Sequence, residues 1–436
     1  MIILEIYVVQ PGDTVYSIAE KFGVSVQRII SDNRLQGQYE LAVGQALLIL
    51  KPHTIHTVRA GESLTEIAQS YGTTVMQLFR NNPTIIGTEY VPAGTQIVIE
   101  FQDEPYAEAE VSGFAYSHIR RNVLEACLPY LTYLIIFGYG FTEDGGIITV
   151  NDSDMISLAH DYGTAVLLSL SSIDVDGSFA SGKVGRLLTD IDFQNMVIEG
   201  LIDVILAKGA QGLDIDMEFV PSQYRLDFAA FAENAANRLN SLGLVLHVDL
   251  APKTSPDQKG ALYESHDYGL LGAAADYVFL MTYEWGYTYG PPMAVAPLPS
   301  VKRVLDYALT EIPRSKIFLG IPNYGYDWAL PYERGVTEAV NMGNLGAVQL
   351  AVSTGSEILF DNYAQSPYFY YTDIYGTEHV VWFEDVRSLY GKYSLAAEND
   401  LRGCGYWNLM RPFPQNYLLL NQMFRIIKKY ERSLFP

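Results

Sequence analysis

Cysteine, positive charge and long apolar stretches are all scarce in this sequence, and each shortage excludes a class of protein. The 436 residues include two cysteines, Cys127 and Cys404, too few for a disulfide scaffold or a cysteine-based zinc module. Lysine and arginine number 28 against 50 aspartates and glutamates, a net charge of −22. Nucleic acid phosphates and anionic lipids would repel such a chain, so we expect neither as a partner. No apolar run reaches the ~18–20 residues of a membrane span.

Aromatic residues, in contrast, are abundant. The 32 tyrosines and 19 phenylalanines exceed what a core needs, and neutral glycans are a common partner for surplus aromatic rings. With 49% hydrophobic and 18% charged residues, the chain is neither disordered nor a coiled coil, and its length predicts two to four domains. The N-terminal MIILEIYVV has no basic start and is too short for a secretory signal. We therefore expect a chain that is cytoplasmic at synthesis, is a mature form, or is exported without a standard signal.

Two segments near the N-terminus are copies of one pattern. VVQPGDTVYSIAEKFGVSVQRIISDN at 8–33 matches TVRAGESLTEIAQSYGTTVMQLFRNN at 57–82, at a constant offset of 49 residues. In each copy, cap-forming residues precede an apolar spacing of three and four, which predicts short helices between two short strands. We expect two small βααβ units, at 1–50 and 51–100, followed by an acidic linker at 101–110.

Both copies resemble the LysM module, whose pattern is a glycine-acid-hydroxyl turn, an Ile-Ala pair, an aromatic-Gly pair and a late asparagine. The resemblance covers residues 6–50 and 54–99, and it implies binding of glycans that contain N-acetylglucosamine, such as peptidoglycan or chitin. The implied glycan-binding positions are the turn and the late asparagine of each copy: Gly12, Asp13, Thr14, Asn33, Gly61, Glu62, Ser63 and Asn82. Two units that act only as spacers are the alternative.

From residue 111 onward, apolar β-rich segments alternate with helical patterns. Eight segments have this character: 111–117, 131–141, 164–172, 211–219, 244–252, 277–285, 317–325 and 403–409. They predict an α/β fold, a (β/α)8 TIM barrel over 111–436, with its active site at the C-terminal ends of the strands. A doubly wound open sheet is the alternative, although no glycine-rich phosphate loop follows the first strand. The long gap before the eighth strand predicts a small α+β insertion at about 326–383.

The segment QGLDIDMEF, residues 211–219, carries the most specific chemical signal. Side chains alternate along a strand, so Asp214, Asp216 and Glu218 share the inward face of the barrel, and the apolar residues between them pack on helices. Close buried carboxyls push one another's pKa values apart, which keeps one of them protonated near neutral pH. We therefore expect a general acid at Glu218 beside a partly charged Asp216.

Two other interpretations of this segment remain open. A solvated edge strand would show the same alternation, and three carboxylates could hold magnesium or calcium. We expect no histidine close enough to complete a transition-metal site, and we predict no metal and no cofactor. Four scattered histidines are interpreted as structural: His118, His247, His266 and His379. DVDG at 174–177 lacks the full spacing of a calcium loop.

The acidic segment resembles the DxxDxDxE strand of family-18 glycoside hydrolases, on the fourth strand of the predicted barrel. The resemblance implies a retaining reaction without a protein nucleophile, in which the 2-acetamido oxygen of the substrate attacks the anomeric carbon. It implies that Glu218 protonates the glycosidic oxygen, that Asp216 orients the acetamide, and that Asp214 supports Asp216. Gln211 stands where chitinases carry the first aspartate, which predicts a different hydrogen-bond network at the base of the motif.

Residues near other strand ends complete the expected groove. MTYE at 281–284 resembles the sixth-strand motif of the family, so Tyr283 is implied to donate to the acetamide carbonyl. Trp407 resembles the tryptophan that forms the floor under the reacting sugar. We expect substrate contacts from Trp407, Tyr116, Glu284, Trp285, Asn323, Tyr324 and Trp328. The third strand has LLSLSS in place of the SxGG of typical chitinases, which weakens the case for chitin as the main substrate.

Further segments resemble spore cortex-lytic enzymes of the SleL/YaaH type, among them LAPKTS at 250–255 and NYGYDWALPY at 323–332. This resemblance implies an N-acetylglucosaminidase that acts on cortex peptidoglycan fragments with muramic-δ-lactam during germination. It implies deposition in the spore integument or on the cell wall without a standard signal peptide. We expect a monomer that binds glycan but neither nucleic acid nor membrane. A chitinase or chito-oligosaccharide hydrolase and a non-catalytic glycan-binding spore coat protein are the alternatives.

Overall fold

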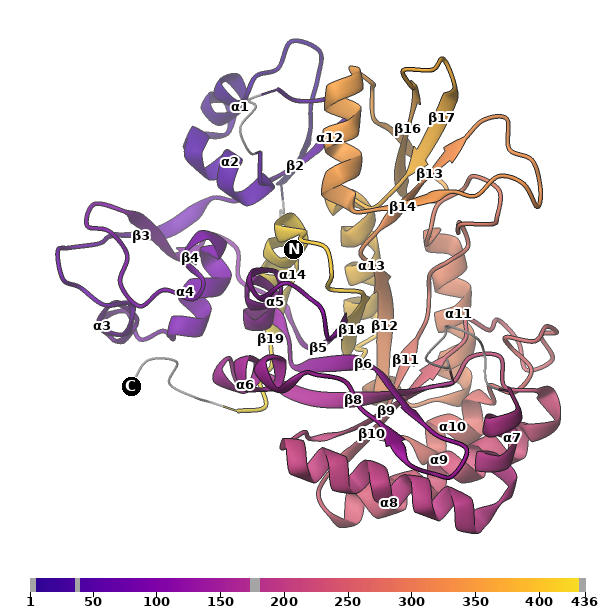
Figure 1. The fold of residues 1–436 in the computed structure, drawn as a ribbon. Helices are drawn as coiled ribbons and strands as arrows, with labels where there is room; N and C mark the ends of the chain where they lie inside the picture. The colour runs from indigo at the N-terminus through magenta and orange to yellow at the C-terminus, as the bar shows by residue number, and fades with distance from the viewer. Residues whose placement is uncertain (1–4, 36–39, 173–180, 431–436) are drawn as a thin grey trace.

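A closed barrel forms the centre of the molecule. The structure, a computed structural model, describes residues 5–35, 40–172 and 181–430 (Figure 1). The eight strands are β5 (Ala107–Tyr116), β6 (Tyr133–Phe141), β8 (Ala165–Ser171), β9 (Gly212–Asp216), β10 (Val245–Leu250), β11 (Tyr277–Leu280), β12 (Ile317–Pro322) and β18 (Gly403–Trp407). They pair in this order, all parallel, and β18 and β6 both pair with β5. The closed sheet confirms the predicted TIM barrel and rules out the open doubly wound sheet.

Helices cover the outside of this barrel, and two short strands extend the sheet. The helices are α5 (Arg121–Cys127), α6 (Ser153–Asp161), α7 (Ser181–Thr189), α8 (Ile191–Lys208), α9 (Arg225–Ser241), α10 (Tyr268–Ala274), α11 (Leu298–Glu311), α13 (Val386–Glu398) and α14 (Pro414–Met423), with 3-10 turns η2 (Leu128–Tyr130), η3 (Ser222–Tyr224) and η4 (Arg314–Lys316). β7 (Ile147–Ile148) pairs with β6, and β19 (Phe424–Ile426) with β5. Among the described residues, none of these helices has the length and apolar character to cross a membrane.

An insertion between β12 and β18 forms a second sheet. Its elements are β13 (Gly325–Ala329), β14 (Val340–Met342), α12 (Asn344–Thr354), β15 (Leu359–Asp361), β16 (Ser366–Thr372) and β17 (Glu378–Trp382). The strands are antiparallel in the order β14-β13-β17-β16-β15, and α12 packs on one face through a small apolar cluster that includes Ala347, Phe369 and Val381. The sequence predicted this α+β insertion, and Figure 1 shows it above one end of the barrel.

The two N-terminal units have the expected βααβ order. The first contains β1 (Glu5–Val8), α1 (Val15–Phe22), α2 (Val26–Asn33) and β2 (Ala46–Ile49); the second contains β3 (Pro52–Thr57), α3 (Leu64–Ser70), α4 (Val75–Asn81), the 3-10 turn η1 (Pro83–Ile85) and β4 (Gln96–Phe101). The two strands of each unit pair antiparallel. Thr14 and Ser63 cap α1 and α3 with reciprocal capping boxes, which explains why each helix begins at that point.

Both units pack directly against the barrel through α14, which is almost wholly buried. Gln415 donates to the carbonyl of Ala46 at 3.1 Å in the first unit, and Asn421 donates to Asn81 at 2.9 Å in the second. The apolar core of the second unit is continuous with that of the barrel. The predicted linker at 101–110 is therefore wrong in extent: β4 continues to Phe101 and β5 begins at Ala107, which leaves residues 102–106 between them.

The first unit also contacts the insertion and, through Arg387, the barrel helix α13. Ile358 donates its backbone N–H to the carbonyl of Val43 at 2.8 Å, and Arg387 donates to the carbonyl of Gly44 at 3.2 Å. A Cβ at Gly44 would lie 1.8 Å from the carbonyl oxygen of Ile358, so the two backbones approach as closely as glycine allows. At the matching Gly94 of the second unit, a Cβ would meet no atom within 4 Å.

This pair of glycines provides a matched test of the docking. Gly44 and Gly94 have φ values of +81° and +87°, so alanine adds a similar left-handed strain, about 1–2 kcal/mol, at either position. Alanine at Gly44 also clashes with Ile358, and we expect Gly44→Ala to release the first unit from the insertion. Hydrogen exchange at the Ile358 amide should then accelerate in Gly44→Ala and stay as in the wild type in Gly94→Ala. Equal exchange in the two variants would contradict this packing.

Candidate active site

The acidic strand β9 delivers its carboxyls to the mouth of the barrel. Asp214 and Asp216 lie in the strand, and Glu218 follows two residues after its end. The residues between them, Leu213, Ile215 and Met217, are buried on the opposite face, as the alternation predicted. Glu218 lies in a turn in which the next residue, Phe219, has a left-handed φ of 54°. The backbone carbonyl of Glu218 accepts a hydrogen bond from the Ser172 hydroxyl at 3.2 Å. The acids are therefore not on a solvated edge strand.

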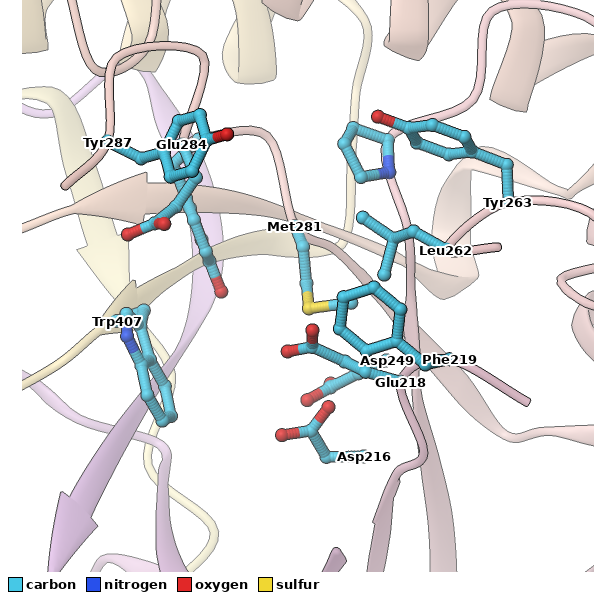
Figure 2. Close-up of a pocket in the computed structure, with 12 residues that line it drawn as sticks. Asp216, Glu218, Phe219, Asp249, Leu262, Tyr263, Met281, Glu284, Tyr287 and Trp407 are labelled. Carbon is cyan, nitrogen blue, oxygen red and sulfur yellow. The ribbon is translucent and has the colours of Figure 1, made fainter. Parts of the chain in front are cut away.

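A cavity of about 500 Å³ opens above this row. Its lining comes from several strand ends: Asp216, Glu218, Phe219, Asp249, Pro252, Leu262, Tyr263, Met281, Tyr283, Glu284, Tyr287 and Trp407. Figure 2 shows Asp216, Glu218 and Asp249 gathered on one side, while Trp407 and Glu284 lie across from them. Acids on one wall and an indole on the other suit a ring with a polar edge and an apolar face, such as a sugar.

Burial and mutual repulsion raise the proton affinity of the acids. Burial, together with the charges of Glu218 and Asp214, raises the pKa of Asp216 well above the usual aspartate range. The pKa of Glu218 is also raised, first by burial and then by the negative charge of Glu284. A carboxyl with a raised pKa keeps its proton at higher pH, so Glu218 is suited to act as a general acid. Asp216 was expected to be partly charged, but burial and the two neighbouring carboxyls raise its pKa so that the neutral form is favoured.

Tyrosines hold the carboxylate of Glu284 at the cavity edge. Tyr324 and Tyr326 donate hydrogen bonds to the same oxygen, Oε1, at 2.8 and 2.9 Å. Glu284 itself has a left-handed φ of 66° in the loop after β11. Tyr283, its neighbour, is buried, and burial followed by the nearby carboxylates Asp249, Asp216 and Glu218 raises its pKa well above 10, so its hydroxyl remains a donor.

Trp407, at the end of β18, is surrounded by other aromatic rings. Its ring lies 5.3 Å from Phe137, 5.6 Å from Phe114 and 6.1 Å from Tyr116 between centroids, in edge-to-face arrangements. Tyr116 also lies close enough to Asp216 and Glu218 for their charges to raise its pKa, after burial. These contacts fix the indole in one orientation at the cavity wall.

Five of the seven predicted substrate-binding residues are not among those that line the cavity: Tyr116, Trp285, Asn323, Tyr324 and Trp328. Trp328 is fully buried and donates its indole N–H to the carbonyl of Gly290 at 2.9 Å. Asn323 is buried and donates to the carbonyls of Asn408 and Arg411, so it holds the loop that follows Trp407. Trp285 packs, half-buried, against the main core. Tyr324 reaches the site only through its bond to Glu284.

Two residues on β10 belong to the acidic cluster, although their part in it was missed in the sequence. His247 pairs in register with Asp214, and its Nδ1 lies 2.7 Å from Asp214 Oδ1. The expectation that no histidine lies near the carboxylates was therefore wrong. Asp249, two residues further on, lines the cavity. The signal was present in the alternation of LHVDL at 246–250, where His247 and Asp249 share one face, but only the barrel order puts that face beside β9.

The predicted glycan-binding positions of the two N-terminal units divide into turn residues and buried residues. Asn33 and Asn82 are buried, and each amide bonds the backbone of its own unit: Asn33 to Ile29 and Leu48, and Asn82 to Leu78 and Val98. A direct glycan contact by either asparagine conflicts with this placement.

The turn residues lie nearer the surface. Gly12, Thr14 and Gly61 are exposed, and Ser63 is a buried helix cap. Asp13 and Glu62 accept from Tyr7 and His56 respectively, at 2.6 and 2.8 Å, a pair repeated at the offset of 49 residues. The repeated pair fixes the same turn in both units.

Gln211 is not among the residues that line the cavity. Gln211 precedes β9, and its Oε1 accepts from the N–H of Val166 at 2.7 Å, so it bonds the neighbouring strand rather than the carboxyl row. The DVDG segment at 174–177 lies outside the residues that the structure describes.

Comparisons with known families and proteins agree with this geometry. The model described as "Glycosyl hydrolases family 18" matches residues 112–411, and the LysM domain model matches residues 7–49 and 56–100. The chain is 35% identical over 434 residues to a cortical fragment-lytic enzyme of Bacillus anthracis, covering 98% of this chain and 100% of that protein.

Solved structures give the same picture. The crystal structure of the Bacillus cereus spore cortex-lytic enzyme SleL superposes with a TM-score of 0.84 at 34% identity, covering 98% of this chain and 100% of that one. A chitinase from Chromobacterium violaceum superposes with a TM-score of 0.67 at 25% identity over 72% of this chain and 98% of that one.

The charge of Glu284, across the cavity from Glu218, predicts a pH effect. The negative charge of Glu284 raises the pKa of Glu218, and the acid form of Glu218 is lost as pH rises through that pKa. Glu284→Gln keeps an oxygen that can accept from Tyr324 and Tyr326 but removes the charge, so the pKa of Glu218 should fall. The alkaline limb of the kcat/KM profile should therefore move to lower pH. An unmoved or upward-shifted limb would contradict the electrostatic link.

Proposed function

Because the chain belongs to glycosyl hydrolase family 18 and carries two LysM domains, we propose that it is an N-acetylglucosaminidase of spore cortex peptidoglycan. The chain is a glycoside hydrolase. The substrate is inferred from relatives of full length that are named for lysis of cortical fragments. The observation that carries the chemistry is the placement of Glu218 and Asp216 on one wall of a cavity whose other wall includes Trp407.

The cavity supports a substrate-assisted reaction. The proton of Glu218 passes to the glycosidic oxygen while the acetamido oxygen of the bound sugar forms a bond to the anomeric carbon and the glycosidic bond breaks. Asp216 orients the acetamide N–H and stabilises the cyclic cation that results, and Tyr283 donates to the acetamide oxygen. The ionised Glu218 then takes a proton from a water molecule. The water oxygen attacks the anomeric carbon and opens the cyclic cation, which restores the acetamido group and gives net retention.

The LysM domains supply the affinity for the polymer. They are proposed to bind glycans that contain N-acetylglucosamine and so to place the enzyme on the spore integument or the cell wall. There the enzyme would cleave cortex fragments that contain muramic-δ-lactam during germination. Because both domains pack on the barrel, they hold the glycan at a set distance from the cavity, and a bound strand is presented to the active site without a flexible tether.

A chitinase is the second candidate, supported by the superposition of the barrel on a bacterial chitinase. That similarity covers 72% of this chain, whereas the similarity to the cortex-lytic enzyme SleL covers 98%. A non-catalytic coat protein is less well supported, because the proton donor Glu218 is present and faces the cavity.

Product analysis tests the proposal. With purified cortex fragments, mass spectrometry should show N-acetylglucosamine at the new reducing end, and chito-oligosaccharides should be cleaved more slowly. Faster cleavage of chito-oligosaccharides would favour the chitinase, and muramic acid at the new reducing end would overturn the assignment of the bond.

The Glu218→Gln variant tests the role of the acid. It should lose at least ~10²–10⁴-fold in kcat, since a positioned proton donor contributes about that much. Binding to insoluble peptidoglycan should persist, because the LysM domains are unchanged. Turnover at the wild-type rate would exclude Glu218 as the donor, and lost binding would show a folding defect instead.

A further inference from the structure

A fourth carboxyl and a histidine stand beside the acidic row, and the reaction as described uses neither. His247 and Asp249 alternate on β10, so both point into the barrel next to β9. The side chains of His247 and Asp214 are fully buried, and that of Asp249 is 3% exposed. Four carboxyls thus meet in one small volume, and they cannot all be ionised there without a large desolvation cost.

The histidine distinguishes between two of these carboxyls. Its Nδ1 lies 2.7 Å from Asp214 Oδ1 and 3.6 Å from Asp249 Oδ1, so its single N–H at that position donates to Asp214. The protonated ring and the neutral tautomer with its hydrogen on Nδ1 both make this donation. Its other nitrogen has no hydrogen-bond partner among the described residues, and the ring packs against Phe279 and Phe318. Asp214 is therefore the carboxyl best stabilised as an anion.

Asp249 is left in the opposite situation. Its Oδ1 is buried without a donor in the described part of the chain. The titratable groups that face it are Asp214 and Asp216 on β9, Glu218 after it, His247 on its own strand and Tyr283 after β11. Burial first, and then the charges of Asp214 and Asp216, raise its pKa well above the usual aspartate range. A buried carboxyl beside an anion is most stable as the neutral acid, which has one O–H to donate.

We propose that Asp249 is a positioning residue for the glycosidase reaction: as a neutral carboxylic acid it donates a hydrogen bond to Asp214. With His247 and Asp249 both donating, Asp214 stays an anion and does not compete for the proton that Asp216 and Glu218 hold. The catalytic proton is thereby confined to the cavity side of the row. Figure 2 shows Asp249 beside Glu218, on the side of the cavity where this proton is needed.

A divalent cation held by Asp214, His247 and Asp249 is the competing explanation. Their potential ligand atoms lie within 4.8 Å of one another. However, the Nδ1 of His247 is already at hydrogen-bonding distance from Asp214, and its Nε2 lies on the side of the ring without a polar partner. A ring nitrogen that donates a hydrogen cannot also bind a metal. The geometry therefore favours hydrogen bonds donated to Asp214 over a bound cation.

Two substitutions separate a proton donor from a carboxylate. Asn keeps an N–H donor at nearly the same position and cannot ionise, so Asp249→Asn should retain kcat within about 3-fold, with the pH profile unchanged. Asp249→Ala removes the donor, which should lower kcat by ~10-fold or more with KM within about 3-fold, since a hydrogen bond to a charged group contributes about that much.

The comparison uses full-length protein and one chromogenic N-acetylglucosaminide, with thermal melts and peptidoglycan binding as folding controls. Equal loss in Asp249→Asn and Asp249→Ala, with intact melts, would show that an ionised carboxylate is required and would overturn the proposal. So would wild-type kinetics in Asp249→Ala, or wild-type activity that is lost with chelator and restored by added calcium or manganese. The inference rests on the family-18 reaction and not on the cortex substrate. A wild type active on the chromogenic sugar but inactive on cortex fragments would sink the proposed substrate alone.

Discussion

Burial of several carboxyls side by side, at the mouth of a parallel barrel, is the constraint that the rest of this structure serves. Asp214, Asp216 and Glu218 are brought together because a strand alternates its faces and because the inner face of the barrel has little access to water. Such a row is unstable as a set of anions. Its raised proton affinity is the property that makes one member an acid at the pH where free carboxyls are ionised.

The surrounding residues can be understood by what they do to that proton. Glu284, held by Tyr324 and Tyr326, adds a negative charge across the cavity from Glu218 and strengthens its hold on the proton. His247 acts in the other direction on Asp214, because a donated hydrogen bond stabilises the charged form. The aromatic rings around Trp407 hold its indole at the cavity wall, where it offers a flat apolar surface to the proposed sugar substrate. The carboxyls on one side of the cavity suit the polar edge of a sugar ring, and Trp407 on the other side suits its apolar face.

Much of this could be predicted from the sequence, since it depends on local periodicity. The alternation in LDIDME placed the three acids, the repeat at an offset of 49 residues predicted the two βααβ units, and the eight apolar segments predicted the barrel. What could not be predicted depends on which elements become neighbours. Asp249 joins the site because β10 pairs with β9 in a particular register, and Asn323 holds the loop after Trp407 because β12 lies beside β18. The acidic segment 101–110 has the composition of a linker, yet its first residue belongs to β4 and its last four residues belong to β5. A single sequence does not show such long-range partners.

The central claim is that the acids supply and hold a proton while the substrate's own acetamido group displaces the leaving group. The most direct test compares kcat/KM for an N-acetylglucosaminide with that for its N-trifluoroacetyl analogue, which has the same shape but a much weaker nucleophilic oxygen. Acetamido participation predicts that the fluorinated substrate is slower by ~100-fold or more, equivalent to about 2.7 kcal/mol in the barrier. Equal rates for the two substrates would exclude displacement by the acetamido group and would contradict the claim.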